Sequence, residues 1–278
     1  MSGFLKDVLM RKALAGAACA AIAVAFSACT DYVAQMEADF EAWAALQGDE
    51  IPLTTPGSST STPTVSVTTG SMLDERDGQI YKTVLIGKQV WMAQNLNYAS
   101  DFFMSYCYND LPSNCDKYGR LYTWATAMDS IGAFSTNGKG CGTKKYGESN
   151  CSPIYPVQGI CPSGWHLPDS TEFQTLFDYV GGDLDNGMKL RSSSGWNNNR
   201  NGSDAYGFSA LPAGGRMLNG EYADLGEDAS FWSSSLSSGF SNYGDYLMLY
   251  DGNGGTRAYG GVGGRIMEYG HSVRCIQN

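Results

Sequence analysis

The sequence has little positive charge, few histidines and no familiar catalytic motif. Its 18 Lys and Arg are outnumbered by 28 Asp and Glu, which gives a net charge of -10 and leaves no basic stripe for nucleic acid. It contains two histidines, and no GxSxG, HExxH or Walker pattern. We therefore expect no nucleic-acid partner, no metal and no cofactor.

The longest apolar run, residues 13–26, has fourteen residues and is shorter than the roughly 20 that a membrane-spanning helix needs. Arg11 and Lys12 precede it, and small residues close it before Cys29. The pattern resembles a lipobox, in which signal peptidase II cuts before a cysteine that carries diacylglycerol, although Phe26 stands where Leu is usual. The alternative is an ordinary secretory signal that happens to contain a cysteine. Because Thr30 rather than Asp follows Cys29, we expect an outer-membrane lipoprotein that faces the periplasm or the cell surface.

The chain divides into four parts by composition. Residues 1–28 are the expected signal peptide, and residues 29–50 form a lipidated N-terminus with a short acidic amphipathic helix. Residues 51–72 are uncharged and rich in Ser, Thr and Pro, which predicts a linker. Residues 73–278 form the expected folded domain.

The domain has six cysteines, an even number that suits an oxidising compartment. None of their spacings is the CxxC of zinc ribbons, so metal ligation is a poor alternative. Six cysteines allow fifteen pairings. Local spacing favours Cys107–Cys115 and Cys141–Cys151, and leaves Cys161–Cys275 as the long closure.

Periodicity predicts an α+β domain with two helices early and a Gly-rich antiparallel sheet late. Two alternating runs around residues 87–88 predict a hairpin. Helices are expected over residues 118–128 and after Asp169, where Glu172 completes a capping box. DYLMLY and TRAYG, around DGNGG, predict a second hairpin at residues 245–260.

Several strings resemble the Fibrobacter succinogenes major paralogous domain, over about residues 74–278 and in the family's order. They are IGKQVWMAQNLNY, YGRLYTWATAM, CPSGWHLPDSTEF, SGWNNNRNGSDAYGFSALPAGGR, FWSSS and SVRC. The sequence departs from the family at His271, where Phe is more frequent. The resemblance implies a C-type-lectin-like fold, similar to formylglycine-generating enzymes, with its termini close together, and it implies no established activity.

Two kinds of function remain open for such a domain. His166 is the obvious general base, but its place before the capped helix favours a structural role. We expect a non-catalytic binding module for polysaccharide or a protein partner, and the alternative is an enzyme of unknown type. Strand alternation makes Tyr246, Tyr250 and Tyr259 the candidate ligand-binding residues and puts Leu247 and Leu249 in the core, unless the opposite register buries the tyrosines.

The lipid anchor is directly testable. Cys29→Ser should abolish lipidation, because the acyl chains have no other thiol at the cleavage site, and should leave an unprocessed precursor or a soluble product. Intact-mass analysis of the wild-type mature protein should show the added acyl groups. A mature chain without them would rule out the lipoprotein interpretation.

Overall fold

The computed structural model describes residues 66–99, 104–142, 151–181, 186–237, 242–251 and 258–278. These ranges belong to one compact unit, residues 63–278. The predicted signal peptide, Cys29, the acidic helix and residues 51–65 of the predicted linker lie outside them. Within the described ranges no helix combines the length and the apolarity that a membrane crossing requires.

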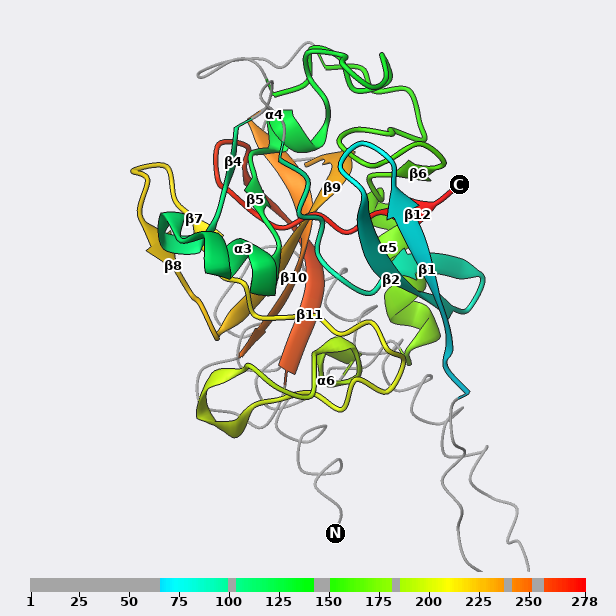
Figure 1. Ribbon diagram of the computed structural model, residues 1–278, viewed down its shortest axis with the longest axis vertical. Coiled ribbons are helices and arrows are strands. Elements are labelled where there is room, and N and C mark those ends of the chain that lie inside the picture. The colour runs from blue at the N-terminus through cyan, green and yellow to red at the C-terminus, as the bar shows by residue number, and fades with distance from the viewer. Residues whose placement is uncertain (1–65, 100–103, 143–150, 182–185, 238–241, 252–257) are drawn as a thin grey trace, which may run out of the picture. The chain divides into compact units, whose positions relative to one another are not determined.

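The described residues form a mixed α+β fold with short helices and antiparallel sheets (Figure 1). The elements in chain order are β1 (Thr68–Asp74), β2 (Gln79–Ile86), β3 (Gln89–Met92), β4 (Ser105–Tyr106), η1 (Tyr108–Asp110), α3 (Pro112–Tyr118), β5 (Leu121–Tyr122), α4 (Trp124–Ala127), β6 (Trp165–His166), α5 (Ser170–Tyr179), α6 (Asn186–Leu190), η2 (Asn197–Asn199), β7 (Gly215–Arg216), β8 (Tyr222–Ala223), β9 (Asp228–Leu236), β10 (Tyr243–Asp251), β11 (Ala258–Ile266) and β12 (Ile276–Gln277).

The larger sheet joins the beginning of the domain to its end. Its strand order is β1-β2-β3-β12-β6, so the C-terminal strand lies between β3 and β6. Ile276 pairs with Trp91 on one side and with His166 on the other. The predicted hairpin is confirmed: β2 and β3 are antiparallel and are joined at Gly87, whose φ of 63° favours glycine.

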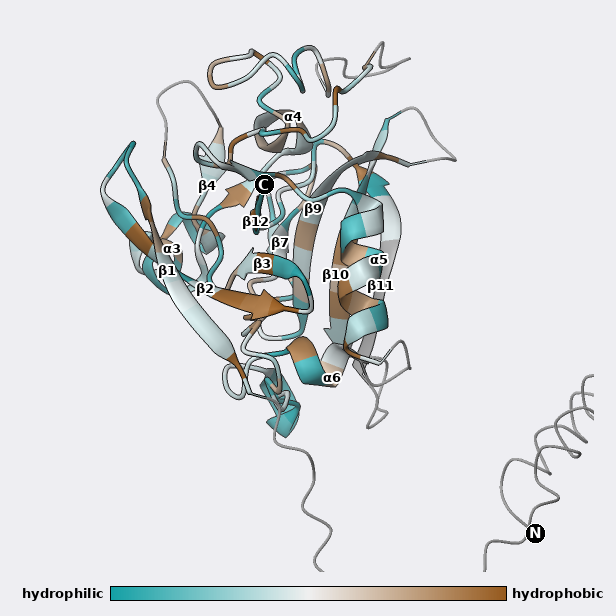
Figure 2. Ribbon diagram, turned by 90° about the vertical axis from the view of Figure 1, so that its right-hand side faces the viewer, coloured by the Kyte–Doolittle hydropathy of each residue, from teal (hydrophilic) through white to brown (hydrophobic). Residues whose placement is uncertain are grey.

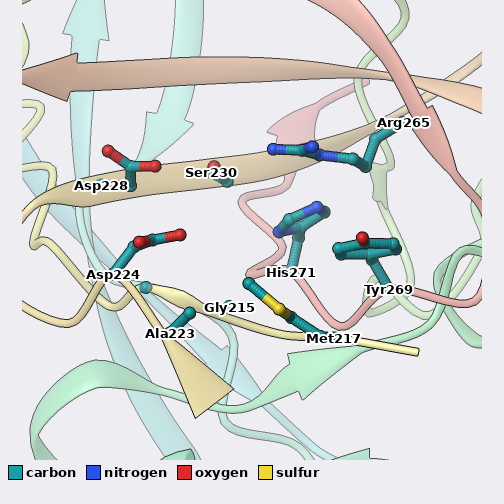
Figure 3. A pocket seen from close by; sticks show the side chains of 10 residues that line it. Gly215, Met217, Ala223, Asp224, Asp228, Ser230, Arg265, Tyr269 and His271 are labelled. Atoms are coloured by element: carbon teal, nitrogen blue, oxygen red, sulfur yellow. The ribbon is translucent and has the colours of Figure 1, made fainter. Parts of the chain in front are cut away.

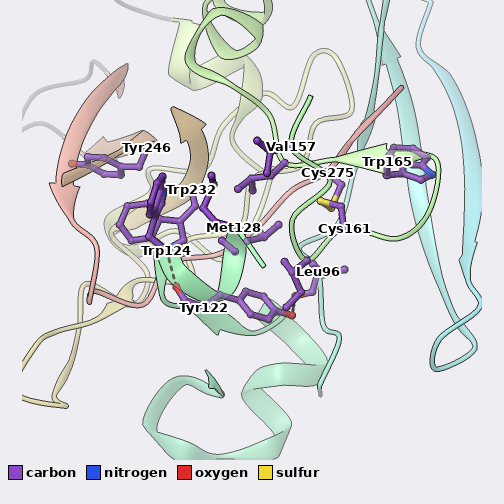
Figure 4. Close-up of a cluster of buried hydrophobic side chains, with 14 of the residues drawn as sticks. Leu96, Tyr122, Trp124, Met128, Val157, Cys161, Trp165, Trp232, Tyr246 and Cys275 are labelled. Atoms are coloured by element: carbon purple, nitrogen blue, oxygen red, sulfur yellow. Dashed lines mark hydrogen bonds between the residues drawn. A yellow bond between two sulfur atoms is a disulfide. The ribbon is translucent and has the colours of Figure 1, made fainter. Parts of the chain in front are cut away.

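The second sheet, β11-β10-β9, is buried on both faces around β10. Alternate residues of β10 enter different core clusters: Tyr246 packs in one and Leu247 in the other. Helix α5 lies along the face that carries Leu247 and Leu249 (Figure 2). The opposite cluster contains Trp232 and Tyr122, whose carbonyl oxygen accepts a hydrogen bond from Trp232 Nε1 at 2.7 Å (Figure 4).

Helix α5 forms where its local sequence predicts it. The Asp169 side chain accepts a hydrogen bond from the backbone N–H of Glu172, and the Glu172 carboxylate accepts one from the backbone N–H of Asp169. Phe173, Leu176 and Phe177 are buried on the face that meets the sheet. The capping box and the apolar spacing were therefore sufficient to predict this helix.

The helix predicted over residues 118–128 is wrong for most of its length. Helix α3 ends at Tyr118, because Gly119 adopts a φ of 74°. The chain then forms β5, in which Tyr122 also bridges to His271, and only α4 is helical. The side chain of Thr123 caps α4 by accepting a hydrogen bond from the backbone N–H of Thr126. A second difference is that β1 begins at Thr68, inside the predicted linker, because it pairs with β2.

The cysteines form the three disulfides that spacing favoured. Cys107–Cys115 and Cys141–Cys151 close local loops, and Cys161–Cys275 links residues 114 apart in the sequence. The last bond joins the segment before β6 to the segment before β12, two neighbouring strands of the larger sheet (Figure 4). It therefore holds the returning C-terminus in the sheet.

The three disulfides should differ in their contribution to stability. In the loop-entropy model, the closure by Cys161–Cys275 constrains the unfolded chain by about 5 kcal/mol, against about 2.6 kcal/mol for the loop of Cys107–Cys115. Replacing both members of a pair with alanine, followed by urea unfolding, should show the larger loss for Cys161 and Cys275. Equal losses from the two double variants would contradict this ranking.

Candidate functional site

The predicted tyrosine face is closed to ligands at Tyr246. Tyr246 is buried at 7% exposure and stacks on His271, with ring centroids 5.4 Å apart at an interplanar angle of 11°. Tyr250 is half-buried and lies opposite Tyr259 in β11, whose side chain lies outside the described part of the structure. Leu247 is fully buried, as predicted. The tyrosine prediction fails at Tyr246 because the C-terminal segment covers this side of the sheet.

A polar pocket lies beside this covered face, and we call it the Asp228 pocket. Its volume is about 180 Å³. The residues that line it come from β9, the end of β11, the segment before β12 and the β7–β8 hairpin (Figure 3). They are Gly214, Gly215, Met217, Ala223, Asp224, Asp228, Ser230, Arg265, Tyr269 and His271.

The β7–β8 hairpin forms one wall of the pocket. Gly215 pairs with Ala223 and both line the pocket, whereas Arg216 pairs with Tyr222 and neither does. This alternation is what a two-stranded ribbon produces, with successive side chains on opposite faces. A Cβ added at Gly215 would lie 3.3 Å from Nδ1 of His271, so the glycine allows the wall to approach the imidazole closely.

His271 is a buried imidazole without a hydrogen-bond partner. It is 4% exposed, and neither ring nitrogen has a partner among the described residues. Trp232, Tyr246 and Tyr269 surround the ring, with centroids 4.7, 5.4 and 6.1 Å away. Burial and then the charge of Arg265 lower the pKa of His271 to about 3. The ring is therefore neutral at pH 7, with one donor and one acceptor nitrogen at the pocket.

The two ends of the Asp228 pocket differ in charge. Asp224 and Asp228 lie at one end, and Arg265 lies with His271 and Tyr269 at the other (Figure 3). Burial, and then the charges of Asp224 and Glu227, raise the pKa of Asp228 to about 6. The residues that line the pocket thus include two carboxylates and one guanidinium. The negative charge at the carboxylate end is therefore less well compensated than the positive charge at the other end.

Arg265 lies against two aromatic rings and forms no salt bridge with a carboxylate of the described residues. Its guanidinium carbon lies 5.4 Å from the ring centroid of Tyr246 and 5.2 Å from that of Tyr269. Its buried Nε has no hydrogen-bond partner in the described ranges. Buried donors normally have partners, so this N–H, like the His271 nitrogens, is suited to an incoming ligand.

His166 makes the kind of structural contacts that its place before α5 favoured over a role as general base. Its Nδ1 lies 2.7 Å from Oδ1 of Asn278 and its Nε2 lies 2.8 Å from the carboxylate of Glu172. Burial lowers the pKa of His166, but its hydrogen bond to Glu172 and the charge of that carboxylate raise it by more, so the net shift is upward. Because both ring nitrogens are engaged, the imidazole ties the C-terminus to α5 beside a second pocket of about 410 Å³.

The predicted absence of a metal site stays a prediction. In the part of the chain that the structure describes, no group of three His, Cys, Asp or Glu side chains could hold a metal ion. Asp183 and Asp185, which begin a sequence similar to a calcium loop, lie outside the described ranges. The arrangement in the Asp228 pocket is suited instead to hydrogen bonding with a small polar ligand.

Sequence reasoning missed most of this pocket. Asp224, Asp228 and Arg265 were not selected, because Arg265 is far from the two aspartates in the sequence and none of the three belongs to a motif. His271 is a polar residue directly before the SVRC string, at a position where the family that the sequence resembles more often has Phe. That departure was the one sequence signal of the pocket.

Comparison with known proteins identifies a family. The model of the Fibrobacter succinogenes major domain matches residues 84–277, which is more than half of the chain. This match confirms the resemblance found in the sequence. No curated protein and no solved structure matches the chain.

Asp228 should reduce stability at neutral pH. Its pKa is raised on folding, so the stability that it contributes is present below about pH 4 and is lost as the pH rises through about 6. Asp228→Asn should therefore stabilise the protein at pH 8 by roughly 1–3 kcal/mol and have little effect at pH 4. Urea unfolding at both pH values measures this.

The matched control is Asp116→Asn, which removes the same charge from an exposed position on α3. It should change stability by less than about 0.5 kcal/mol at either pH. An Asp228→Asn variant that is less stable than the wild type at pH 8 would contradict the pKa assignment.

Proposed function

We propose that this chain, which belongs to the Fibrobacter succinogenes major domain family, is a membrane-anchored extracytoplasmic binding module for polysaccharide. Residues 29–67 would link the lipid on Cys29 to the domain and hold the domain away from the outer membrane. The domain would bind without catalysis, and its fold would be C-type-lectin-like. Strand β12, at the C-terminal end of the domain, pairs with β3 near its beginning, and this return of the chain supports that fold assignment.

The observation that carries the proposal is the set of unpartnered polar groups in the Asp228 pocket. His271 supplies a donor and an acceptor nitrogen and Arg265 supplies a donor, all three without partners among the described residues. Asp228 lines the same pocket and supplies a further acceptor. A buried polar group without a partner is destabilising by about 1–3 kcal/mol, so a pocket that contains several of them favours a polar ligand.

A sugar residue suits this set of groups. Its hydroxyls both donate and accept hydrogen bonds, as the pocket requires, and the ring of Tyr269 offers an apolar surface beside them. The pocket is smaller than the roughly 300–1,000 Å³ that drug-sized ligands occupy, which favours one sugar residue of a longer chain. The neutral His271 supports binding rather than base catalysis, because a group with a pKa of about 3 is a weak base.

One observation favours the alternative of an enzyme. The pKa of Asp228, at about 6, is close to the range in which a carboxyl exchanges protons efficiently. An acid–base catalyst on this fold would therefore use Asp228. Chromatography of each bound glycan after long incubation decides between the two, since binding without products supports the non-catalytic module.

The binding proposal is tested with a glycan array, using the chain from residue 29 onward. The best glycan is then titrated against the wild type and His271→Phe. We expect the variant to bind about two- to tenfold more weakly, because its ring offers no hydrogen bond, which is worth about 0.5–1.5 kcal/mol.

Tyr250→Ala is the matched control, because it alters the tyrosine face and not the pocket. It should leave the affinity within twofold of the wild type, and thermal melts should show that both variants are folded. Loss of binding in Tyr250→Ala, with binding retained in His271→Phe, would place the site on the tyrosine face. An array without any bound glycan would refute the polysaccharide proposal.

A further inference from the structure

We propose that the Asp228 pocket selects a sugar residue with a free amino group, and that the protonated amine lies at the end formed by Asp224 and Asp228. This inference rests on the proposed function, because it assumes that the pocket binds a sugar, and it adds the chemical class of that sugar. The charges along the pocket, the unpartnered groups at its other end and its small volume support it.

The end of the pocket formed by Asp224 and Asp228 is negatively charged. Asp224 and Asp228 both line the pocket, and Glu227 lies between them in the sequence. Within the described ranges neither aspartate forms a salt bridge; the ion pairs found there join Arg76 to Asp74 and His166 to Glu172. Burial is the largest cause of the raised pKa of Asp228; the charges of Asp224 and Glu227 raise this pKa further, and the more weakly acting Arg265 and Arg191 lower it. A ligand that brings a positive charge to this end relieves the repulsion between the carboxylates.

The opposite end of the pocket determines how the ligand is oriented. Arg265 lies at the opposite end of the pocket, where its charge repels an ammonium group (Figure 3). Its Nε–H and the buried ring of His271 offer hydrogen bonds to hydroxyl or ring oxygens at that end. His271, at 4% exposure, is thus a second observation that points to a ligand, independent of the acidic residues. The amine and the hydroxyls of an amino sugar match the two ends in one orientation.

The charge of the pocket favours an amino sugar over acidic and neutral sugars. An acidic sugar would place its carboxylate among two aspartates and one arginine, so the net interaction is unfavourable. A neutral or N-acetylated sugar can hydrogen-bond to the same groups, but it leaves the carboxylates uncompensated. The pocket is therefore expected to prefer an amino sugar to the neutral sugar of the same stereochemistry.

The test compares matched pairs of free sugars at pH 7, by calorimetric or NMR titration of the chain from residue 29 onward. The pairs are glucosamine and glucose, galactosamine and galactose, and mannosamine and mannose, with N-acetylglucosamine as a further neutral ligand. We expect at least one amino sugar to bind about tenfold more tightly than its neutral partner, and N-acetylglucosamine to bind like glucose.

Two isosteric variants locate the amine. Asp224→Asn and Asp228→Asn should each reduce the preference for the amino sugar, measured as the ratio of its affinity to that of the neutral sugar, at least threefold. Asp224 has a φ of 64°, which asparagine also adopts readily, so the turn before β9 is retained. Glu227→Gln is the control: it removes the same charge from an exposed neighbour that does not line the pocket, and it should keep most of the preference.

The outcomes separate this inference from the proposed function. Equal affinity for amino and neutral sugars overturns the inference and leaves the polysaccharide proposal standing. A preference that survives in the Asp224→Asn/Asp228→Asn double variant, or that Glu227→Gln abolishes equally, also overturns it. If no sugar binds here and no glycan binds on the array, the proposed function fails.

Discussion

The structure depends on the return of the last eight residues through the centre of the domain. His271 exchanges backbone hydrogen bonds with Tyr122, and the backbone N–H of Trp232 donates to the carbonyl of Ser272. Arg274 is fully buried, and its guanidinium donates to Asn95 Oδ1 and to the carbonyl oxygens of Phe208 and Ser209. Strand β12 then pairs with β3 and β6. One short segment thus connects the larger sheet, β5 and β9. The three hydrogen bonds of the Arg274 guanidinium fix the position of this segment.

This return explains where a ligand can bind. The C-terminal segment covers the side of the β11-β10-β9 sheet on which Tyr246 lies, so this sheet has buried side chains on both faces. Where the segment leaves β11 and turns towards β12 it does not fill the space completely, and the β7–β8 hairpin closes the remaining gap. The Asp228 pocket is therefore a consequence of the same segment that closes the tyrosine face. His271 enters the pocket because the neighbouring backbone is fixed at Tyr122.

The features that the sequence predicted are those set by neighbouring residues. The capping box of α5, the turn at Gly87 and the two local disulfides depend on residues within about ten positions of one another, so their patterns are readable. The helix over residues 118–128 failed because a tertiary bridge to His271 overrides its helical spacing. The pocket was not predictable for the same reason: Asp228 and Arg265 line one pocket only after β9, β10 and β11 have paired. Alternation placed Leu247 correctly, but it carries no information about what covers the other face.

The perturbed groups of the pocket also affect how stability depends on pH. His271 has a lowered pKa, so the stability that it contributes is lost as the pH falls from about 6.5 towards 3. Asp228 has a raised pKa, so the stability that it contributes appears as the pH falls from about 6 towards 4. The two effects therefore oppose each other between about pH 4 and 6, and below that range the larger shift of His271 dominates. A weak dependence of stability on pH over that range would not show that the pocket is electrostatically neutral. It would reflect two groups of one pocket that are destabilising in different pH ranges, Asp228 at neutral pH and His271 at acidic pH, as is typical of sites kept for binding rather than for folding.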